Sequence, residues 1–176
     1  QRTWVTDSSS CLRAVETGYP EAGHELRAET LHLAEYLLFF RDALAERGRE
    51  AMERGELPVP TIRVHDACGL HRRLGRAAAV YEVLELATGQ RPESLGLSPD
   101  RTECCGAGDF HDLRRPEAAR LVGSRSVEGR TLARGTRVVT GDSACVGALR
   151  QSLPDQVPVH DVAGFLVDWF APLLEG

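Results

Sequence analysis

The cysteines are the residues of this sequence best suited to chemistry, and four of the five follow a pattern. Cys68, the adjacent pair Cys104–Cys105 and Cys145 are separated by 36, 1 and 40 residues. They end or interrupt three short stretches, TIRVHDAC, TECCGAG and VVTGDSAC. Soft thiolates gathered from three loops are the ligands that iron–sulfur clusters and zinc prefer. The pattern therefore predicts a metal site with these four cysteines as ligands, and leaves open whether a cluster or zinc occupies it.

The adjacent pair needs an unusual backbone if both of its thiols are to face one site. In an extended strand, neighbouring side chains point to opposite faces. Gly106 and Gly108 follow the pair and permit the positive φ of a tight turn. The stretch CCGAG is therefore more specific than a chance pair of cysteines. The alternative is a set of structural thiols, because free cysteine is often simply buried.

Strands and helices alternate around these stations. Short β-rich runs lie at 3–6, 61–65, 136–141 and 157–160, and amphipathic or apolar runs predict helices at 27–46, 70–89, 116–135, 143–153 and 161–174. Such alternation is typical of an α/β fold, with a parallel sheet of short strands flanked by helices. Loops at the strand ends carry function in such sheets, so the three cysteine stations are expected at one edge.

The sequence also contains an internal repeat. WVTDSSSCLRAV, residues 4–15, shares five identities with VVTGDSACVGAL, residues 138–149, when Cys11 is aligned with Cys145, and residues 33–40 resemble 162–169. This predicts three parts: residues 1–50 as the end of a first repeat with its following helix, 51–60 as a linker, and 61–176 as a complete second repeat. Cys11 would have its partners in the rest of the first repeat, so we expect it to be an unligated thiol.

The segments VHDACGLHRRLG, ECCGAGDFHDLRRPEAAR and VVTGDSACVGALRQ resemble the cysteine-rich CCG domain over about residues 62–170. Members of that family include the lactate-utilisation iron–sulfur protein, the iron–sulfur subunit of glycolate oxidase and, more distantly, the CCG-containing subunit of heterodisulfide reductase. The resemblance implies an iron–sulfur cluster, [4Fe–4S] in type, held by Cys68, Cys104, Cys105 and Cys145. It also implies two repeats per protein, which agrees with the internal repeat.

The sequence departs from the strictest form of the family motif, which ends in CPxC. Asp142 stands three residues before Cys145, and Ser8 stands at the equivalent place before Cys11. A cluster site of four cysteines is therefore expected, with Asp142 either near the cluster or capping the helix that follows it. His65 lies at a strand end near Cys68, where a structural role is favoured over ligation.

The family resemblance implies an electron-transfer subunit, not itself catalytic, of an oxidoreductase complex acting on a small 2-hydroxy acid such as lactate or glycolate. Its partners would be a flavoprotein dehydrogenase subunit and another iron–sulfur subunit. One alternative is a zinc-binding or metal-free assembly module. Another is catalysis at the cluster, as in heterodisulfide reductase, which the missing CPxC cysteine disfavours.

Composition excludes several other classes. The net charge of −5 argues against nucleic-acid binding. No run approaches the ~20 apolar residues of a membrane span, and no signal peptide is recognised, so we expect a cytoplasmic protein with reduced thiols. Air should damage the site, leaving it empty or with two thiols oxidised. An incomplete first repeat would expose apolar surface and favour self-association.

Overall fold

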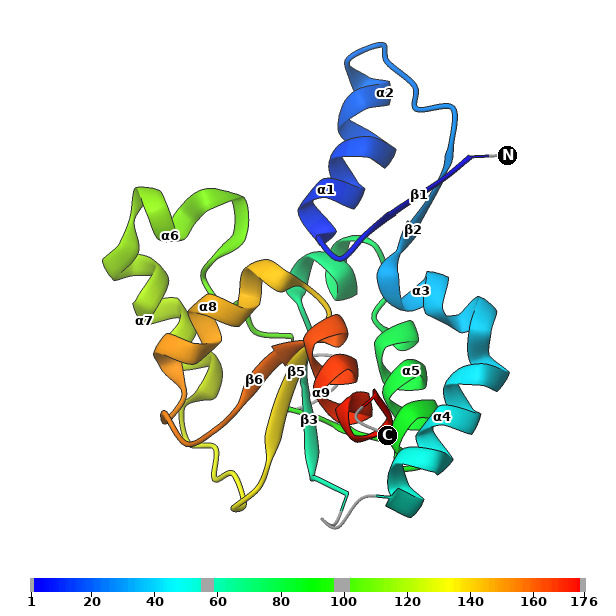
Figure 1. Ribbon diagram of the computed structural model, residues 1–176. Coiled ribbons are helices and arrows are strands. Elements are labelled where there is room, and N and C mark those ends of the chain that lie inside the picture. The colour runs from blue at the N-terminus through cyan, green and yellow to red at the C-terminus, as the bar shows by residue number, and fades with distance from the viewer. Residues whose placement is uncertain (1, 55–58, 97–101, 175–176) are drawn as a thin grey trace.

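The computed structural model describes residues 2–54, 59–96 and 102–174, and it confirms the predicted α/β class (Figure 1). The larger sheet has the strand order β4-β3-β5-β6, and all of its strands are parallel. Its strands are β3 (Ile62–His65), β4 (Glu93–Ser94), β5 (Arg137–Thr140) and β6 (Val159–Asp161). None of the helices in the described ranges is both long and apolar enough to cross a membrane.

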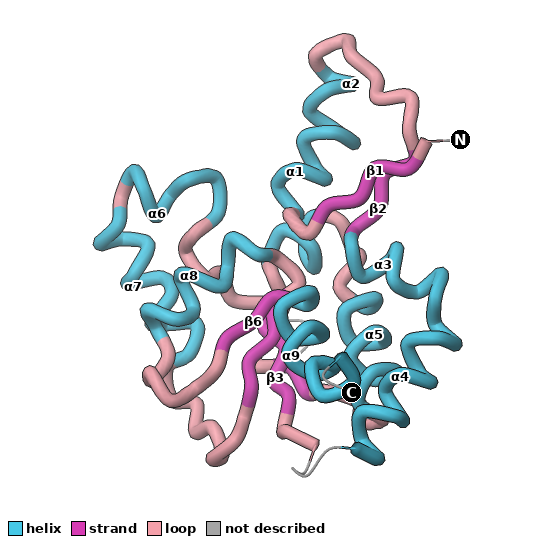
Figure 2. Tube along the Cα trace, viewed as in Figure 1, coloured by secondary structure: helices cyan, strands magenta, loops and turns pink. Residues whose placement is uncertain are grey.

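A second, two-stranded sheet pairs β1 (Thr3–Thr6) with β2 (Glu29–His32), again in parallel. Figure 2 shows it apart from the larger sheet, in a lobe that also carries α1 and α2. The turns and short helices of the molecule are α1 (Ser9–Arg13), η1 (Ala14–Gly18), α2 (Tyr19–Glu21), α3 (Leu33–Leu37), η2 (Leu38–Phe40), η3 (Gly69–Arg73), η4 (Gly108–Phe110) and α6 (His111–Arg114).

The longer helices cover the larger sheet from two flanks. In Figure 1, α4 (Arg41–Arg54), α5 (Ala78–Thr88) and α9 (Val162–Leu174) lie on one flank, and α7 (Pro116–Val127) and α8 (Ser143–Ser152) lie on the other. The core between them includes the fully buried side chains of Val64, Val138, Val139, Leu149 and Phe165. Strands buried on both faces explain why β3 and β5 are rich in apolar residues.

The structure corrects the helix predicted over residues 27–46. Residues 29–32 form β2 and only then does α3 begin, with the His32 ring accepting a hydrogen bond from the backbone of Ala34 at 3.1 Å. Apolar periodicity continues across the strand–helix junction and so conceals it. The predicted helix at 116–135 ends at Val127. Helix α4 extends to Arg54 into the predicted linker at 51–60, of which residues 55–58 lie outside the described part of the chain.

The backbone geometry supports the internal repeat. Strand β1 and the start of α1 correspond to β5 and the start of α8 at one offset of 134 residues. Strand β2 and the start of α3 correspond to β6 and the start of α9 at an offset of 129. The registers also match, because Thr6 pairs with His32 just as Thr140 pairs with Asp161. We call β1–α3 the first unit and β5–α9 the second unit.

Candidate metal centre

Three segments at one edge of the larger sheet, two loops and the first turn of α8, carry the four cysteines. Cys68 directly precedes η3, after β3, and Cys145 lies in the first turn of α8, after β5. Strands β3 and β5 are neighbours and parallel, so their carboxyl ends meet at the same edge. Cys104 and Cys105 lie in the loop before η4. The expectation that the three cysteine-containing segments converge is therefore confirmed.

The sulfurs are arranged as two close pairs. The Sγ atoms of Cys68 and Cys104 lie 3.7 Å apart, and those of Cys105 and Cys145 lie 2.9 Å apart. All of these thiols are free. The inner pair is buried, with 2% of Cys105 and 6% of Cys145 exposed, whereas Cys68 and Cys104 are half-buried. Within the described residues, no three His, Cys, Asp or Glu side chains stand ready to hold a metal ion, so the role of the cysteines as ligands stays a prediction.

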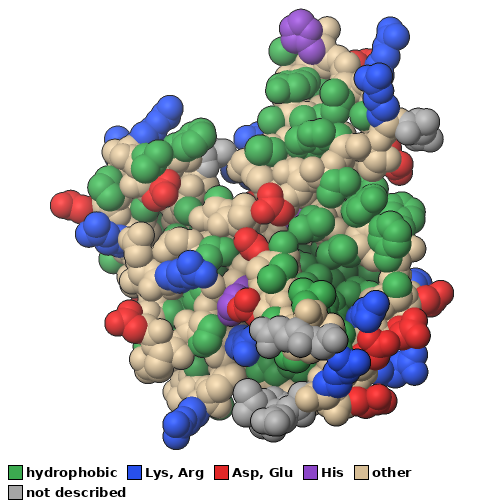
Figure 3. All heavy atoms as spheres, in the orientation of Figure 1, with side chains coloured by type: hydrophobic (Ala, Val, Ile, Leu, Met, Phe, Trp, Pro, Cys, Tyr) green, Lys and Arg blue, Asp and Glu red, His purple; other side chains and the backbone are tan. Residues whose placement is uncertain are grey.

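One cavity of about 690 Å³ is lined by all five cysteines, Cys11 included. Its walls come from α1 of the first unit, from the start of η3, from the first turn of α8 and from η4 and α6. Figure 3 shows the notch between the lobe of the first unit and the lobe of α6 and α7. Several lining residues were not predicted from the sequence, because they come from parts of α1, η3, η4 and α6 that were not expected at the site. They are Ser9, Arg13, Arg73, Phe110 and His111.

The turn after the cysteine pair requires glycine at its first position. Gly106 adopts a φ of 89°, in the left-handed region that glycine favours. A Cβ atom there would lie 2.3 Å from the carbonyl oxygen of Ala119 in α7. The Gly106 amide donates a hydrogen bond to Cys104 Sγ at 3.3 Å. The prediction of a glycine-supported turn is confirmed for Gly106; Gly108 has no positive φ and instead begins η4.

Asp142 caps α8, which confirms the helix-capping role that was one of the two expectations for it. Its Oδ1 accepts a hydrogen bond from the amide of Ala144 at 3.1 Å. The other oxygen, Oδ2, accepts bonds from the amide of Ser9 at 3.1 Å and from the Ser9 hydroxyl. Asp142 also lines the cavity, but hydrogen bonds engage both of its oxygens. It therefore holds the first turn of α8, and with it Cys145, against α1.

His65 is buried and is not among the residues that line the cysteine cavity. Its Nδ1 lies 3.3 Å from Thr140 Oγ1, which ties β3 to β5. Its Nε2 and Thr102 Oγ1 have no hydrogen-bond partner in the described part of the chain, and both residues line a second cavity of about 10 Å³. Burial lowers the pKa of His65 below its ordinary value, only partly opposed by Asp66. These contacts favour the structural role expected for His65.

One thiol of each pair, Cys68 and Cys105, has a raised pKa. The hydrogen bond with Cys104 and burial raise the pKa of the Cys68 thiol, and the guanidinium of Arg72 opposes this rise. The hydrogen bond with Cys104 lowers the pKa of Cys105, but its bond with Cys145 and its burial outweigh this and raise the pKa to about 12. Metal binding must displace these protons, so we expect it to weaken as pH falls.

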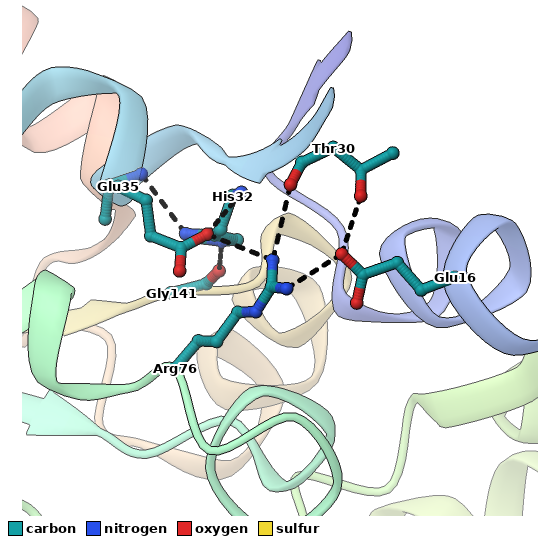
Figure 4. A network of polar contacts seen from close by, with 7 residues as sticks. Glu16, Thr30, His32, Glu35, Arg76 and Gly141 are labelled. Carbon is teal, nitrogen blue, oxygen red and sulfur yellow. Dashed lines mark hydrogen bonds and ion pairs between the residues drawn. The ribbon is translucent and has the colours of Figure 1, made fainter. Parts of the chain in front are cut away.

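Polar contacts hold the first unit against the rest of the molecule (Figure 4). Arg76, in the loop before α5, donates to Glu16 at 2.8 Å and to Glu35 at 3.2 Å. The buried ring of His32 lies 2.7 Å, through Nε2, from the carbonyl oxygen of Gly141. This second contact joins the end of β2 to the residue that precedes Asp142. Together with the Ser9–Asp142 bonds, these contacts fix α1 as one wall of the cavity.

Comparison with models of known protein families found no match for this chain, and comparison with curated proteins found none either.

Proposed function

We propose that this chain is an iron–sulfur electron-transfer unit whose cluster is bound by Cys68, Cys104, Cys105 and Cys145. One observation carries the proposal: four thiols from three segments at one edge of a parallel sheet line a single cavity of about 690 Å³. Four cysteine thiolates are the donor set of [4Fe–4S] clusters. When bound, such a cluster supplies one-electron transfer.

In this proposal, the chain's own residues account for the binding of the cluster. Cys105 and Cys145 come from the buried side of the cavity, whereas Cys68 and Cys104 face its more open side. Asp142 orients the helix turn that carries Cys145. Arg72 lies close enough to Cys68 to favour its thiolate form. The donors thus differ in burial around one site, which is a means of tuning a redox potential.

By family resemblance, we propose that the unit serves an oxidoreductase complex that acts on a small 2-hydroxy acid such as lactate or glycolate. A flavoprotein dehydrogenase subunit would deliver electrons to the cluster, and another iron–sulfur subunit would accept them. The reduced cysteines fit the cytoplasm, where thiols are kept reduced. No residue in this proposal acts as an acid, a base or a nucleophile.

Zinc is the second candidate, and one distance favours it. Tetrahedral zinc with Zn–S bonds of about 2.3 Å separates its sulfurs by about 3.8 Å. The Sγ atoms of Cys68 and Cys104 lie 3.7 Å apart, close to that value. A zinc site would make the chain a structural or assembly module and not an electron carrier.

Anaerobic purification followed by iron, acid-labile sulfide and zinc analysis tests the two candidates. The cluster proposal predicts a brown protein with nearly equal amounts of iron and sulfide, whose visible absorption bleaches on reduction. A colourless protein with one zinc per chain would support the zinc site. A colourless protein that takes up neither iron with sulfide nor zinc, while its thiols remain reduced, would overturn both.

A further inference from the structure

The pairing of the four sulfurs has a consequence that does not depend on metal. A disulfide bond is about 2.0 Å long. The Cys105 and Cys145 sulfurs, at 2.9 Å, need to approach by only about 1 Å to reach it. Cys68 and Cys104, at 3.7 Å, start from van der Waals contact. Each pair joins side chains from two different segments, so closing it crosslinks the walls of the cavity.

We propose that the metal-free site is a disulfide-forming redox centre, which a small peroxide oxidises to a Cys105–Cys145 and a Cys68–Cys104 disulfide. The oxidised site has no free thiolate left to offer a metal, so oxidation closes it to loading until a thiol reductant reopens it. The pairing is independent of the proposed function, and only the effect on metal loading rests on it.

The chemistry balances with hydrogen peroxide as the oxidant. One cysteine sulfur of a pair attacks the peroxide, the O–O bond breaks, and a sulfenic acid and one water form. The partner sulfur then attacks the sulfenic sulfur, the S–S bond forms, and a second water leaves. Each pair thus loses two electrons and two protons to one peroxide. The cavity of about 690 Å³ is large enough to admit this oxidant to both pairs.

Cys11 provides an internal reference within the same cavity. It is exposed on α1, and in the described part of the chain its sulfur has no thiol within hydrogen-bond distance. Its counterpart in the second unit, Cys145, lies 2.9 Å from a partner. Peroxide is therefore expected to leave Cys11 outside any intramolecular disulfide, although both cysteines border one space.

The test uses the full chain after treatment with a chelator and a reductant, and hydrogen peroxide is the probe. Remaining thiols are alkylated, and peptides are mapped without reduction. Because Cys104 and Cys105 share a peptide, two variants separate the pairs. Cys104→Ser should retain the Cys105–Cys145 link and leave Cys68 alkylated, and Cys105→Ser should retain the Cys68–Cys104 link and leave Cys145 alkylated. In the unmodified chain only Cys11 should be alkylated, and in Cys11→Ser no cysteine should be.

Several outcomes would overturn the pairing: a Cys104–Cys105 disulfide in the unmodified chain, a Cys68–Cys105 link in Cys104→Ser, a link to Cys11, or oxidation without any S–S bond. Metal uptake is measured separately, with zinc and with iron plus sulfide, before and after reduction. Metal uptake by the oxidised chain would contradict the proposal that oxidation closes the site to metal. A reduced chain that binds no metal would refute the proposed function and leave the mapped disulfides standing.

Discussion

The two units have the same backbone plan and different surroundings. Thr6 accepts a hydrogen bond from the amide of Ser8 at 3.1 Å, just as Thr140 accepts one from Asp142 at 3.4 Å. Yet Cys11 is exposed, whereas its counterpart Cys145 is buried against another thiol. The strand–turn–helix plan therefore only presents a cysteine at a sheet edge. What packs against that edge decides whether the cysteine has partners.

The helices that follow show the same contrast. Phe165 of α9 is fully buried and stacks on Trp169, whose indole nitrogen donates to the carbonyl of Ala87 at 2.8 Å. Their counterparts, Tyr36 and Phe40, are 36% and 52% exposed, and Figure 3 shows apolar side chains gathered over α3, α4 and α9. In the larger sheet β5 has a strand on each side, whereas β1 is paired only with β2 within the described residues. The expected apolar surface beside the first unit is present, and self-association through it stays a prediction.

Phe165 and its counterpart Tyr36 offer the largest expected difference in stability between the two units. Phe165→Ala should lower the free energy of unfolding by about 3–5 kcal/mol, because it removes a fully buried ring from the core. Tyr36→Ala, at the equivalent position, should cost less than about 1 kcal/mol, because its partly exposed ring loses little burial. Urea denaturation of the metal-free protein measures both. Equal losses would mean that the units do not differ in packing as described.

Ser8 and Asp142, which cap α1 and α8, should differ by a smaller amount in their contribution to the free energy of unfolding. Asp142→Ala removes a helix cap and strips the Ser9 amide and hydroxyl of their acceptor, so we expect a loss of about 2–4 kcal/mol. Ser8→Ala removes one 3.4 Å bond to the amide of Cys11 and should cost about 0.5–1 kcal/mol. Asp142→Ser keeps a capping oxygen but does not reach Ser9. Its loss of stability should therefore lie between those of Ser8→Ala and Asp142→Ala. Urea midpoints for Asp142→Ser and the unmodified chain that coincide would contradict the role of the Ser9 bonds.

The smallest expected effect is on the pH dependence of stability, through His65 between β3 and β5. Burial lowers the pKa of His65 below its ordinary value of 6.5. Below that pH the unfolded chain binds a proton that the folded His65 resists, so this contribution to stability is present above pH 6.5 and is lost as pH falls. His65→Gln should therefore flatten the acid side of the pH–stability curve. The exposed His24 provides the control, and a curve changed equally by His24→Gln would exclude His65 as the cause.

The sequence was sufficient to predict the fold class and the meeting of the cysteines. Cys68 and Cys145 each follow a predicted strand of one parallel sheet, whereas Cys104 and Cys105 lie in a predicted turn after a loop. An offset of 134 residues aligns Cys11 with Cys145. A second offset, of 129 residues, also indicates β2. Residues 33–40 align with 162–169, so the residues before Leu33 align with the predicted strand before α9. The helical periodicity of residues 27–46 conceals that strand.

Other features depend on contacts that local sequence does not encode. The bond from Ser9 to Asp142 joins residues 133 positions apart, and nothing in the stretch SSSC marks one serine as its donor. The wall of η4 and α6, including Phe110 at a φ of 59°, likewise follows from how the turn after the cysteine pair enters α7. Such features arise from tertiary packing, which overrides local preference.

The matched cysteines of the two units test the central claim most directly. Cys145→Ser and Cys11→Ser are to be prepared without oxygen and reconstituted with iron and sulfide alongside the unmodified chain. If the cluster is bound by the four-cysteine site to which the second unit contributes Cys145, Cys145→Ser should lose most of its iron and change its reduced-state paramagnetic resonance spectrum. Cys11→Ser should keep the iron content and the spectrum of the unmodified chain. Loss of iron in Cys11→Ser, or full retention in Cys145→Ser, would contradict a site built from Cys68, Cys104, Cys105 and Cys145.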